Sequence, residues 1–194
     1  MPAHHLKHEA SRNQLAAARA FAGKGLLSGS DPASRPDRVT VMRRSSVLAH
    51  SPQEVLDLCM SREGFPAMMP DPFELQWSST ERGELGGTYD FRWLFKGILP
   101  VRWTAFVDSY TEGREFSDIQ MRGIFRYYHH THTCEPHPEG CFYTDTVVFR
   151  SFLGPHVDRL VMLPQLRHLF GFRHGRMAAM LDLLEAGTGI RDVK

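Results

Sequence analysis

Residues 115–150 read EFSDIQMRGIFRYYHHTHTCEPHPEGCFYTDTVVFR, and core-forming and solvent-facing side chains alternate along most of this stretch. Alternation with a period of two is typical of β-strands that turn one face toward a core. Glycines and prolines interrupt the alternation, and between the interruptions we predict strands over residues 115–121, 125–134 and 141–150. Consecutive strands with short connections form an antiparallel meander rather than parallel βαβ units.

The same strand pattern continues upstream, where it predicts strands over residues 39–48, 74–79, 88–95 and 101–110. Between the first two of these, Ser51-Pro52-Gln53-Glu54 carries the signals of a helix N-terminus. Ser is a preferred N-cap, Pro is tolerated at the first helical position, and Glu three residues after the cap completes a capping box. We therefore expect a short helix after Ser51, and a second one over residues 62–68.

Residues 156–185 are helical in pattern, because apolar side chains recur there at steps of three and four. Pro164 is expected to start or kink this helix. A curved sheet of this size cannot bury its concave face alone, and this helix is the only predicted element long enough to cover it. The prediction is an α+β helix-grip fold, a curved antiparallel sheet wrapped around a long C-terminal helix. An internal cavity is expected between them, because aromatic residues dominate both surfaces.

The chain divides into three parts on composition. Residues 1–38 form a flexible tail, with an alanine-rich segment at 9–22 that favours a helix and a Gly/Ser/Pro linker at 23–38. The helix-grip domain is expected over residues 39–186, followed by a C-terminal tail at 187–194.

Charge and cysteine content exclude several classes of protein. The 23 basic and 22 acidic residues nearly cancel, which argues against a broad nucleic-acid or membrane-surface patch. No apolar stretch predicts a membrane span or a secretory signal. The three cysteines fit neither a disulfide framework nor a zinc motif. We expect a cytoplasmic protein that binds no nucleic acid and does not insert into membranes.

Several motifs resemble the START-like superfamily (SRPBCC), the polyketide cyclase/dehydrase and lipid-transport group, and in particular a bacterial branch of it. They are Phe116-Ser-Asp118-Ile-Gln120, Gly123-Ile-Phe125, Tyr128-His-His130-Thr-His132, Thr144-Asp145 and Phe170-Gly-Phe-Arg173. The resemblance covers about residues 40–185, although the branch has Trp at position 128 and Pro at position 124. It implies the helix-grip fold and a small hydrophobic ligand, but the superfamily hosts carriers and enzymes on one scaffold.

A row of polar side chains is expected inside the apolar sheet. His130 and His132 share one face of their strand. If Cys134 lies opposite Cys141, Asp145 falls directly across from His130. The register is assumed, and a slip by one residue would turn each set outward.

On the preceding strand, Asp118 and Gln120 share a face, and a suitable turn places Asp118 on the other flank of His130. One interpretation of this row is structural: the carboxylates and imidazoles pair across the strands and stabilise the sheet. Two other interpretations are functional: the row is the polar floor of a ligand cavity, or it is an acid–base site. The catalytic candidates are His130, Asp145 and Asp118. The His-x-His spacing also fits a metal site, but it is common in strands without metal, so no metal and no cofactor are expected.

The predicted ligand contacts are residues of this row together with aromatic residues that pack in the core and can also form the wall of the cavity. They are Tyr89, Phe91, Trp93, Trp103, Gln120, Tyr128, His130, His132, Asp145 and Phe170.

Three functions remain open. The first is binding of a small hydrophobic molecule (lipid, polyketide or aromatic-like) as a carrier or sensor. The second is a polyketide cyclase or dehydratase that uses the His/Asp pair, and the third is a protein-interaction module that uses residues 1–38 or 62–72. The sequence leaves open whether the protein is an enzyme and what its oligomeric state is.

Overall fold

The computed structural model describes residues 39–70, 72–79, 83–95 and 98–187. The expected helix at 9–22, the linker at 23–38 and most of the C-terminal tail lie outside these ranges.

Within the described residues, seven antiparallel strands form one sheet with the order β1-β7-β6-β5-β4-β3-β2. Every predicted strand is present, with ends within three residues of the prediction. The strands are β1 (Thr40–Leu48), β2 (Phe73–Ser78), β3 (Thr88–Phe95), β4 (Leu99–Thr111), β5 (Glu115–Arg122), β6 (Phe125–His137) and β7 (Gly140–Ser151).

One of the helices, α2 (Pro52–Met60), begins where the sequence places its cap. It starts with the predicted capping box, in which the Ser51 hydroxyl accepts from the Glu54 N–H and the Glu54 carboxylate accepts from the Ser51 N–H. α3 is a single turn (Gly64–Ala67). The C-terminal helical region consists of α4 (Pro155–Val157), a π-helical turn η2 (Asp158–Met162) and α5 (Leu163–Glu185), with Pro164 in the first turn of α5.

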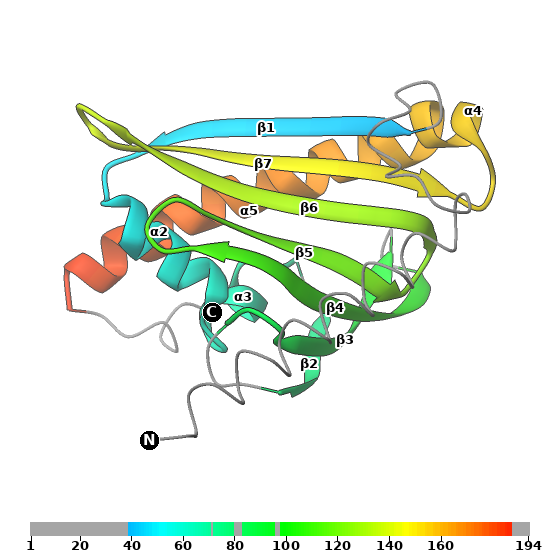
Figure 1. Cartoon of the computed structure of the whole chain (residues 1–194), viewed down its shortest axis with the longest axis horizontal. Coiled ribbons are helices and arrows are strands. Elements are labelled where there is room, and N and C mark those ends of the chain that lie inside the picture. The colour runs from blue at the N-terminus through cyan, green and yellow to red at the C-terminus, as the bar shows by residue number, and fades with distance from the viewer. Residues whose placement is uncertain (1–38, 71, 80–82, 96–97, 188–194) are drawn as a thin grey trace, which may run out of the picture.

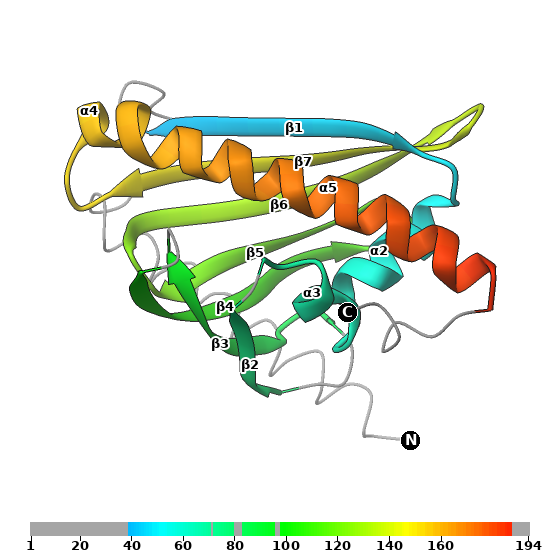
Figure 2. The ribbon, with the colours of Figure 1, turned by 180° about the vertical axis from the view of Figure 1, so that it is seen from behind.

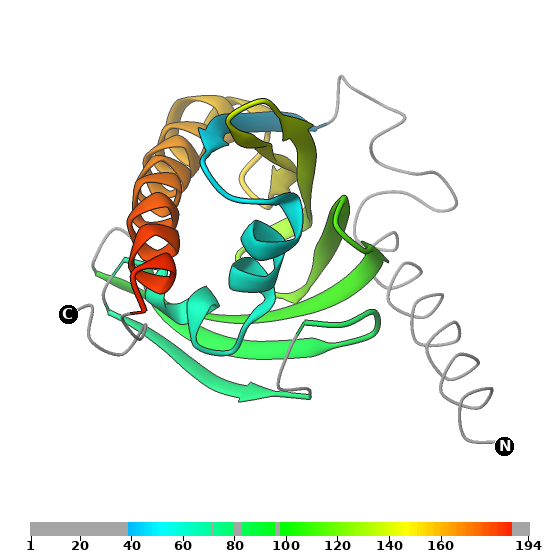
Figure 3. The ribbon, with the colours of Figure 1, turned by 90° about the vertical axis from the view of Figure 1, so that its left-hand side faces the viewer.

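The long helix lies along the concave face of the sheet, as the helix-grip prediction requires. Seen from behind, α5 crosses the sheet from the α4 end to the α2 end (Figure 2). Viewed along the helix, the sheet curls around one side, and α2 and α3 lie inside the curve (Figure 3). No helix among the described residues has both the length and the hydropathy needed to cross a membrane.

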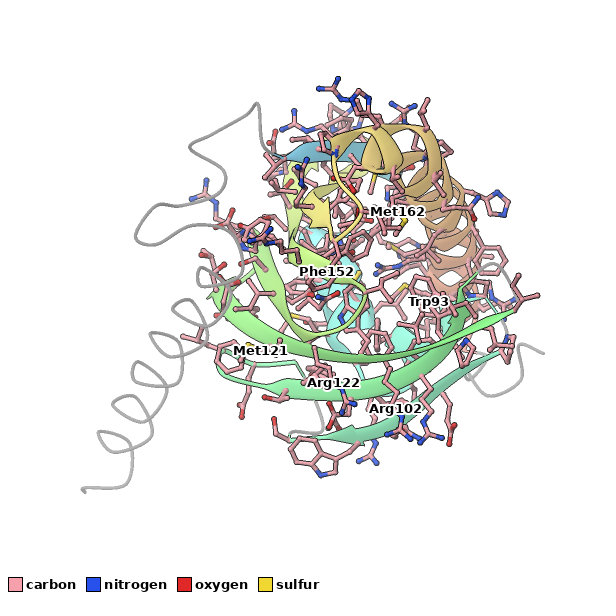
Figure 4. All side chains as sticks on the ribbon, turned by 90° about the vertical axis from the view of Figure 1, so that its right-hand side faces the viewer. Trp93, Arg102, Met121, Arg122, Phe152 and Met162 are labelled. Carbon is pink, nitrogen blue, oxygen red and sulfur yellow. The ribbon has the colours of Figure 1, made fainter. Side chains whose placement is uncertain are left out.

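The core is divided along the length of α5. One cluster is rich in aromatic rings and packs Trp103, Phe125 and Phe149 against Phe170 near the start of α5. The other packs α2 and β7 against Met177 and neighbouring residues near the end of α5. Figure 1 shows α2 beside this end of α5. Figure 4 shows Trp93 on the inner side of the sheet, whereas Arg102 and Arg122 point outward. The polar row predicted from the sequence lies between the two clusters.

The predicted pairing of β6 with β7 is wrong by two residues. Cys134 pairs with Tyr143 instead of Cys141, and Asp145 pairs with His132 instead of His130. Because side-chain direction repeats every two residues, a shift of two leaves every side chain on its predicted face. The polar row therefore still faces inward.

The shift arises at the hairpin turn. β6 runs on through Pro136 to His137, and β7 begins at Gly140, so the turn is shorter than the sequence indicated. Gly140 has a positive φ of 125°, a conformation that L side chains rarely adopt, which allows this tight connection. On the other side of β6, Asp118 lies opposite His130 as predicted.

Candidate functional site

The site is organised around Asp145, a carboxylate with 0% solvent exposure in the middle of β7. Its Oδ1 accepts a hydrogen bond from the Tyr143 hydroxyl at 2.7 Å and lies 2.8 Å from His130 Nε2. His132 Nδ1 lies 3.0 Å from the same oxygen. The second oxygen, Oδ2, is 2.9 Å from His174 Nε2 on α5. Both oxygens of the Asp145 carboxylate thus have hydrogen-bonding partners.

These contacts set the orientation of the two histidine rings on β6. A carboxylate only accepts hydrogen bonds, so His130 turns its Nε2–H toward Asp145. The Tyr143 hydroxyl donates to Asp145, so its oxygen accepts from His132 Nδ1–H at 2.6 Å, and the same N–H also faces Asp145 Oδ1. The remaining ring nitrogens, His130 Nδ1 and His132 Nε2, lie 3.4 Å and 3.7 Å from Asp118 Oδ2. His130 therefore bridges two carboxylates, one fully buried and one that borders the pocket described below.

The pKa shifts follow from this geometry. Burial opposes the charge of Asp145 and Asp118, but His130 and His132 outweigh it and hold the pKa of both carboxyls below the usual range. Burial also opposes the charge of His130, yet the two carboxylates raise its pKa above the ordinary value. Burial and the neighbouring His130 lower the pKa of His132. The arrangement favours an imidazolium at His130 and a neutral ring at His132.

A pocket with a free volume of about 80 Å³ adjoins this cluster, between the sheet, α3 and α5. Its walls are mainly aromatic and aliphatic, and Asp118, His130, His132 and Arg173 supply the ionisable side chains. The other lining residues include Cys59, Met60, Phe65, Met69, Tyr89, Phe91, Trp93, Trp103, Val107, Phe116, Tyr128, Leu166, Leu169 and Phe170.

Eight of the ten predicted ligand contacts line this pocket, and two do not. Asp145 lies behind the histidines, where it orients their rings. Gln120 instead closes the β5–β6 turn: its Nε2 donates to the Phe125 carbonyl at 2.6 Å, and its Oε1 accepts from the Phe125 N–H at 3.2 Å. Gly123 makes this possible, because any side chain there would collide with the Gln120 amide.

Two residues of α5 that were not among the predicted contacts complete the cluster. Arg173 lines the pocket, with its guanidinium carbon 5.0 Å from the Phe170 ring centroid. His174 joins Asp145 to the Ser46 hydroxyl, which lies 2.7 Å from His174 Nδ1. Both follow Phe170 at steps of three and four, so helical spacing places them on its buried face.

Asp118, His130 and His132 could also hold a metal ion by ligand type, since their donor atoms lie within 4.8 Å of one another. A proton on His130 Nδ1 faces Asp118 Oδ2 at 3.4 Å, so an imidazolium at His130 balances part of the charge of the two carboxylates.

No protein-family model matches the chain, and no curated protein sequence is similar to it. Solved structures do match in fold. Protein CV1439 from Chromobacterium violaceum is 14% identical with a TM-score of 0.59, and the match covers 73% of this chain and 96% of that one. This chain has the helix-grip fold.

Two enzymes show the same fold. A norcoclaurine synthase from Thalictrum is 15% identical with a TM-score of 0.59, over 77% of this chain and 97% of that one. The di-domain aromatase/cyclase StfQ of steffimycin biosynthesis is 12% identical with a TM-score of 0.59, over 80% of this chain and 55% of the di-domain enzyme. At these identities the START-like likeness concerns the fold alone, so function must be argued from the site.

Proposed function

We propose that this START-like protein binds a small hydrophobic molecule in the pocket between sheet and α5, as a carrier or sensor. The observation that carries the proposal is the pocket itself, with its aromatic walls and a few ionisable groups at one end. Ligand sites are typically apolar hollows with a small number of polar groups that fix orientation.

The free volume of about 80 Å³ narrows the ligand class. Pockets for drug-sized ligands span roughly 300–1,000 Å³. The ligand is therefore compact and aromatic-like, rather than a long-chain lipid. The three cysteines are free, which supports a reducing, cytoplasmic location.

Tryptophan fluorescence tests the proposal directly. Trp93 and Trp103 line the pocket, whereas Trp77 is 53% exposed, and these are the three tryptophans of the chain. In a Trp77→Phe variant, naphthalene-sized aromatic probes should quench or shift the remaining emission in a saturable way. Native mass spectrometry should show the same one-to-one complex. No saturable change with any compact aromatic, and no bound mass, would refute ligand binding.

A second candidate function is a cyclase or dehydratase, favoured by the position of His130 between two carboxylates. In a dehydration, Asp118 takes the α-proton of a β-hydroxy ketone while the hydroxyl leaves as water with a proton from His130. The double bond forms between the two carbons, and the residues then exchange the proton back. Both StfQ and norcoclaurine synthase are named as biosynthetic proteins, which supports this candidate by analogy of fold only.

The enzyme candidate is tested with an aryl β-hydroxy ketone as the probe. His130→Gln should abolish the release of enone while His129→Gln, the matched change on the outer face of the same strand, leaves it intact. Probe binding without turnover by the unmodified protein would leave the carrier proposal in place and remove the enzyme.

Residues 62–72 are not favoured as a protein-interaction surface, because Phe65 and Met69 turn into the pocket.

A further inference from the structure

Arg173 is a buried cation that borders the pocket. Only 5% of its surface is exposed, and it lies one helical turn after Phe170 on the inner face of α5. Its guanidinium sits over the Phe170 ring, an arrangement that stabilises the cation but satisfies none of its N–H donors.

Within the described residues, Arg173 forms no ion pair or hydrogen bond, and its buried Nε lacks a partner. Arg150, by contrast, has an ion-pair partner, because its guanidinium lies 3.5 Å from the Asp158 carboxylate. Buried charges are normally paired, and a guanidinium carries five donors that require acceptors.

The carboxylates nearby are already committed. Asp145 is occupied on both oxygens by histidines and by Tyr143. Asp118 Oδ2 faces His130 and His132. Neither carboxylate lies within ion-pair distance of Arg173, so the part of the chain that the structure describes supplies no acceptor for the buried Nε–H.

We propose that Arg173 binds the carboxylate of a compact aromatic acid whose ring lies among the aromatic walls of the pocket. This inference rests on the proposed ligand-binding function and names its ligand class. A guanidinium presents two parallel N–H groups that match the two oxygens of a carboxylate. Asp118 repels an anion, so the acid group lies on the α5 side of the pocket and any hydroxyl or carbonyl group of the ligand points toward His130.

The experiment compares matched pairs of probes, benzoate with benzamide and 1-naphthoate with 1-naphthamide, by calorimetry and by fluorescence of the Trp77→Phe protein. Each pair keeps the ring and the size, and replaces one carboxylate oxygen with an uncharged NH2 group. The unmodified pocket should bind the carboxylates about tenfold or more tightly than the amides, the effect of a charged hydrogen bond in a buried site.

Variants at two positions of α5 test whether Arg173 causes the preference for carboxylates. Arg173→Met keeps the apolar stem and should remove the preference for carboxylates while retaining amide binding. Arg173→Lys should keep only part of it, because the ammonium lacks the planar fork. Arg167→Met makes the same change at an exposed position of α5 and should leave the preference intact.

The outcomes separate the two proposals. Equal affinity of the unmodified protein for acids and amides overturns the role of Arg173 and leaves ligand binding standing. A preference that survives in Arg173→Met also overturns it. Binding of neither acids nor amides overturns both proposals. If Arg173→Met fails to fold, the acid–amide comparison in the unmodified protein and in Arg173→Lys still decides.

Discussion

Replacing Asp145 by Asn tests whether this carboxylate holds the centre of the site together. The substitution conserves shape but exchanges one acceptor oxygen for an NH2 group, and it removes the negative charge. In the native protein, Asp145 Oδ1 contacts His130, His132 and Tyr143, and Oδ2 contacts His174. In the variant the NH2 group points at donors whichever way the amide turns.

The size of the effect can be worked from these contacts. His174 can change tautomer and accept from the new NH2 group, so one contact is retained. The others lose their charge assistance, and breaking one partner of a buried ionic cluster costs about 3–5 kcal/mol. For a domain of this size each kcal/mol lowers Tm by roughly 2–4 °C. We expect a loss of about 3–5 kcal/mol and of about 6–20 °C in Tm.

The assay is equilibrium unfolding in urea at pH 7, followed by far-UV circular dichroism. Asp90→Asn is the matched control, because Asp90 lies on β3 of the same sheet, away from the cluster, is half-buried, and accepts a single hydrogen bond from the Thr104 hydroxyl at 2.6 Å. It should cost about 1 kcal/mol, the net value of one hydrogen bond. A loss below about 1 kcal/mol for Asp145→Asn, or one equal to the control, refutes the view that Asp145 organises the cluster.

Three further predictions concern the same region. Gln120→Leu removes both hydrogen bonds to Phe125 and should lower the free energy of unfolding by about 1–3 kcal/mol without changing probe affinity, measured by urea unfolding and calorimetry. The raised pKa of His130 means that its contribution to stability is complete below about pH 6.5 and is lost as pH rises through its folded pKa. Tm should therefore fall as the pH rises above about 6.5, and His130→Gln should abolish that decline. If a proton rather than a metal lies between Asp118 and His130, dialysis against EDTA will leave Tm unchanged; a clear drop, reversed by zinc or cobalt, would contradict this.

The elements of this fold were predictable because their signals are local. Alternation marks the strands, glycine and proline mark the turns, and the Ser51 capping box starts α2 where it predicts. The inward direction of His130 and His132 also followed from strand periodicity alone. Such features depend on residues a few positions apart.

The register of β6 with β7 was not predictable to the same degree. A hairpin turn fixes it, and the sequence PHPEG permits more than one turn length. Arg173 and His174 escaped prediction as site residues for a different reason. The apolar stripe of α5 was traced through leucines, methionines and phenylalanines. Arg173 entered only as part of a family motif, and neither it nor His174 was assigned to the buried face, although both are as buried as the apolar residues of the stripe.

The pairing of the first strand with the last has a consequence for how the chain assembles. Thr40 lies opposite Phe149, so β1 leaves the ribosome early and has no partner until nearly the whole domain has been synthesised. The hairpins from β3 to β7 can form as they emerge, because each strand pairs with the next. Long-range pairing of this kind slows folding, since the loop must close before its contacts form. The sheet can therefore gain β1 only after β7 has been synthesised, which ties its completion to the last strand of the domain.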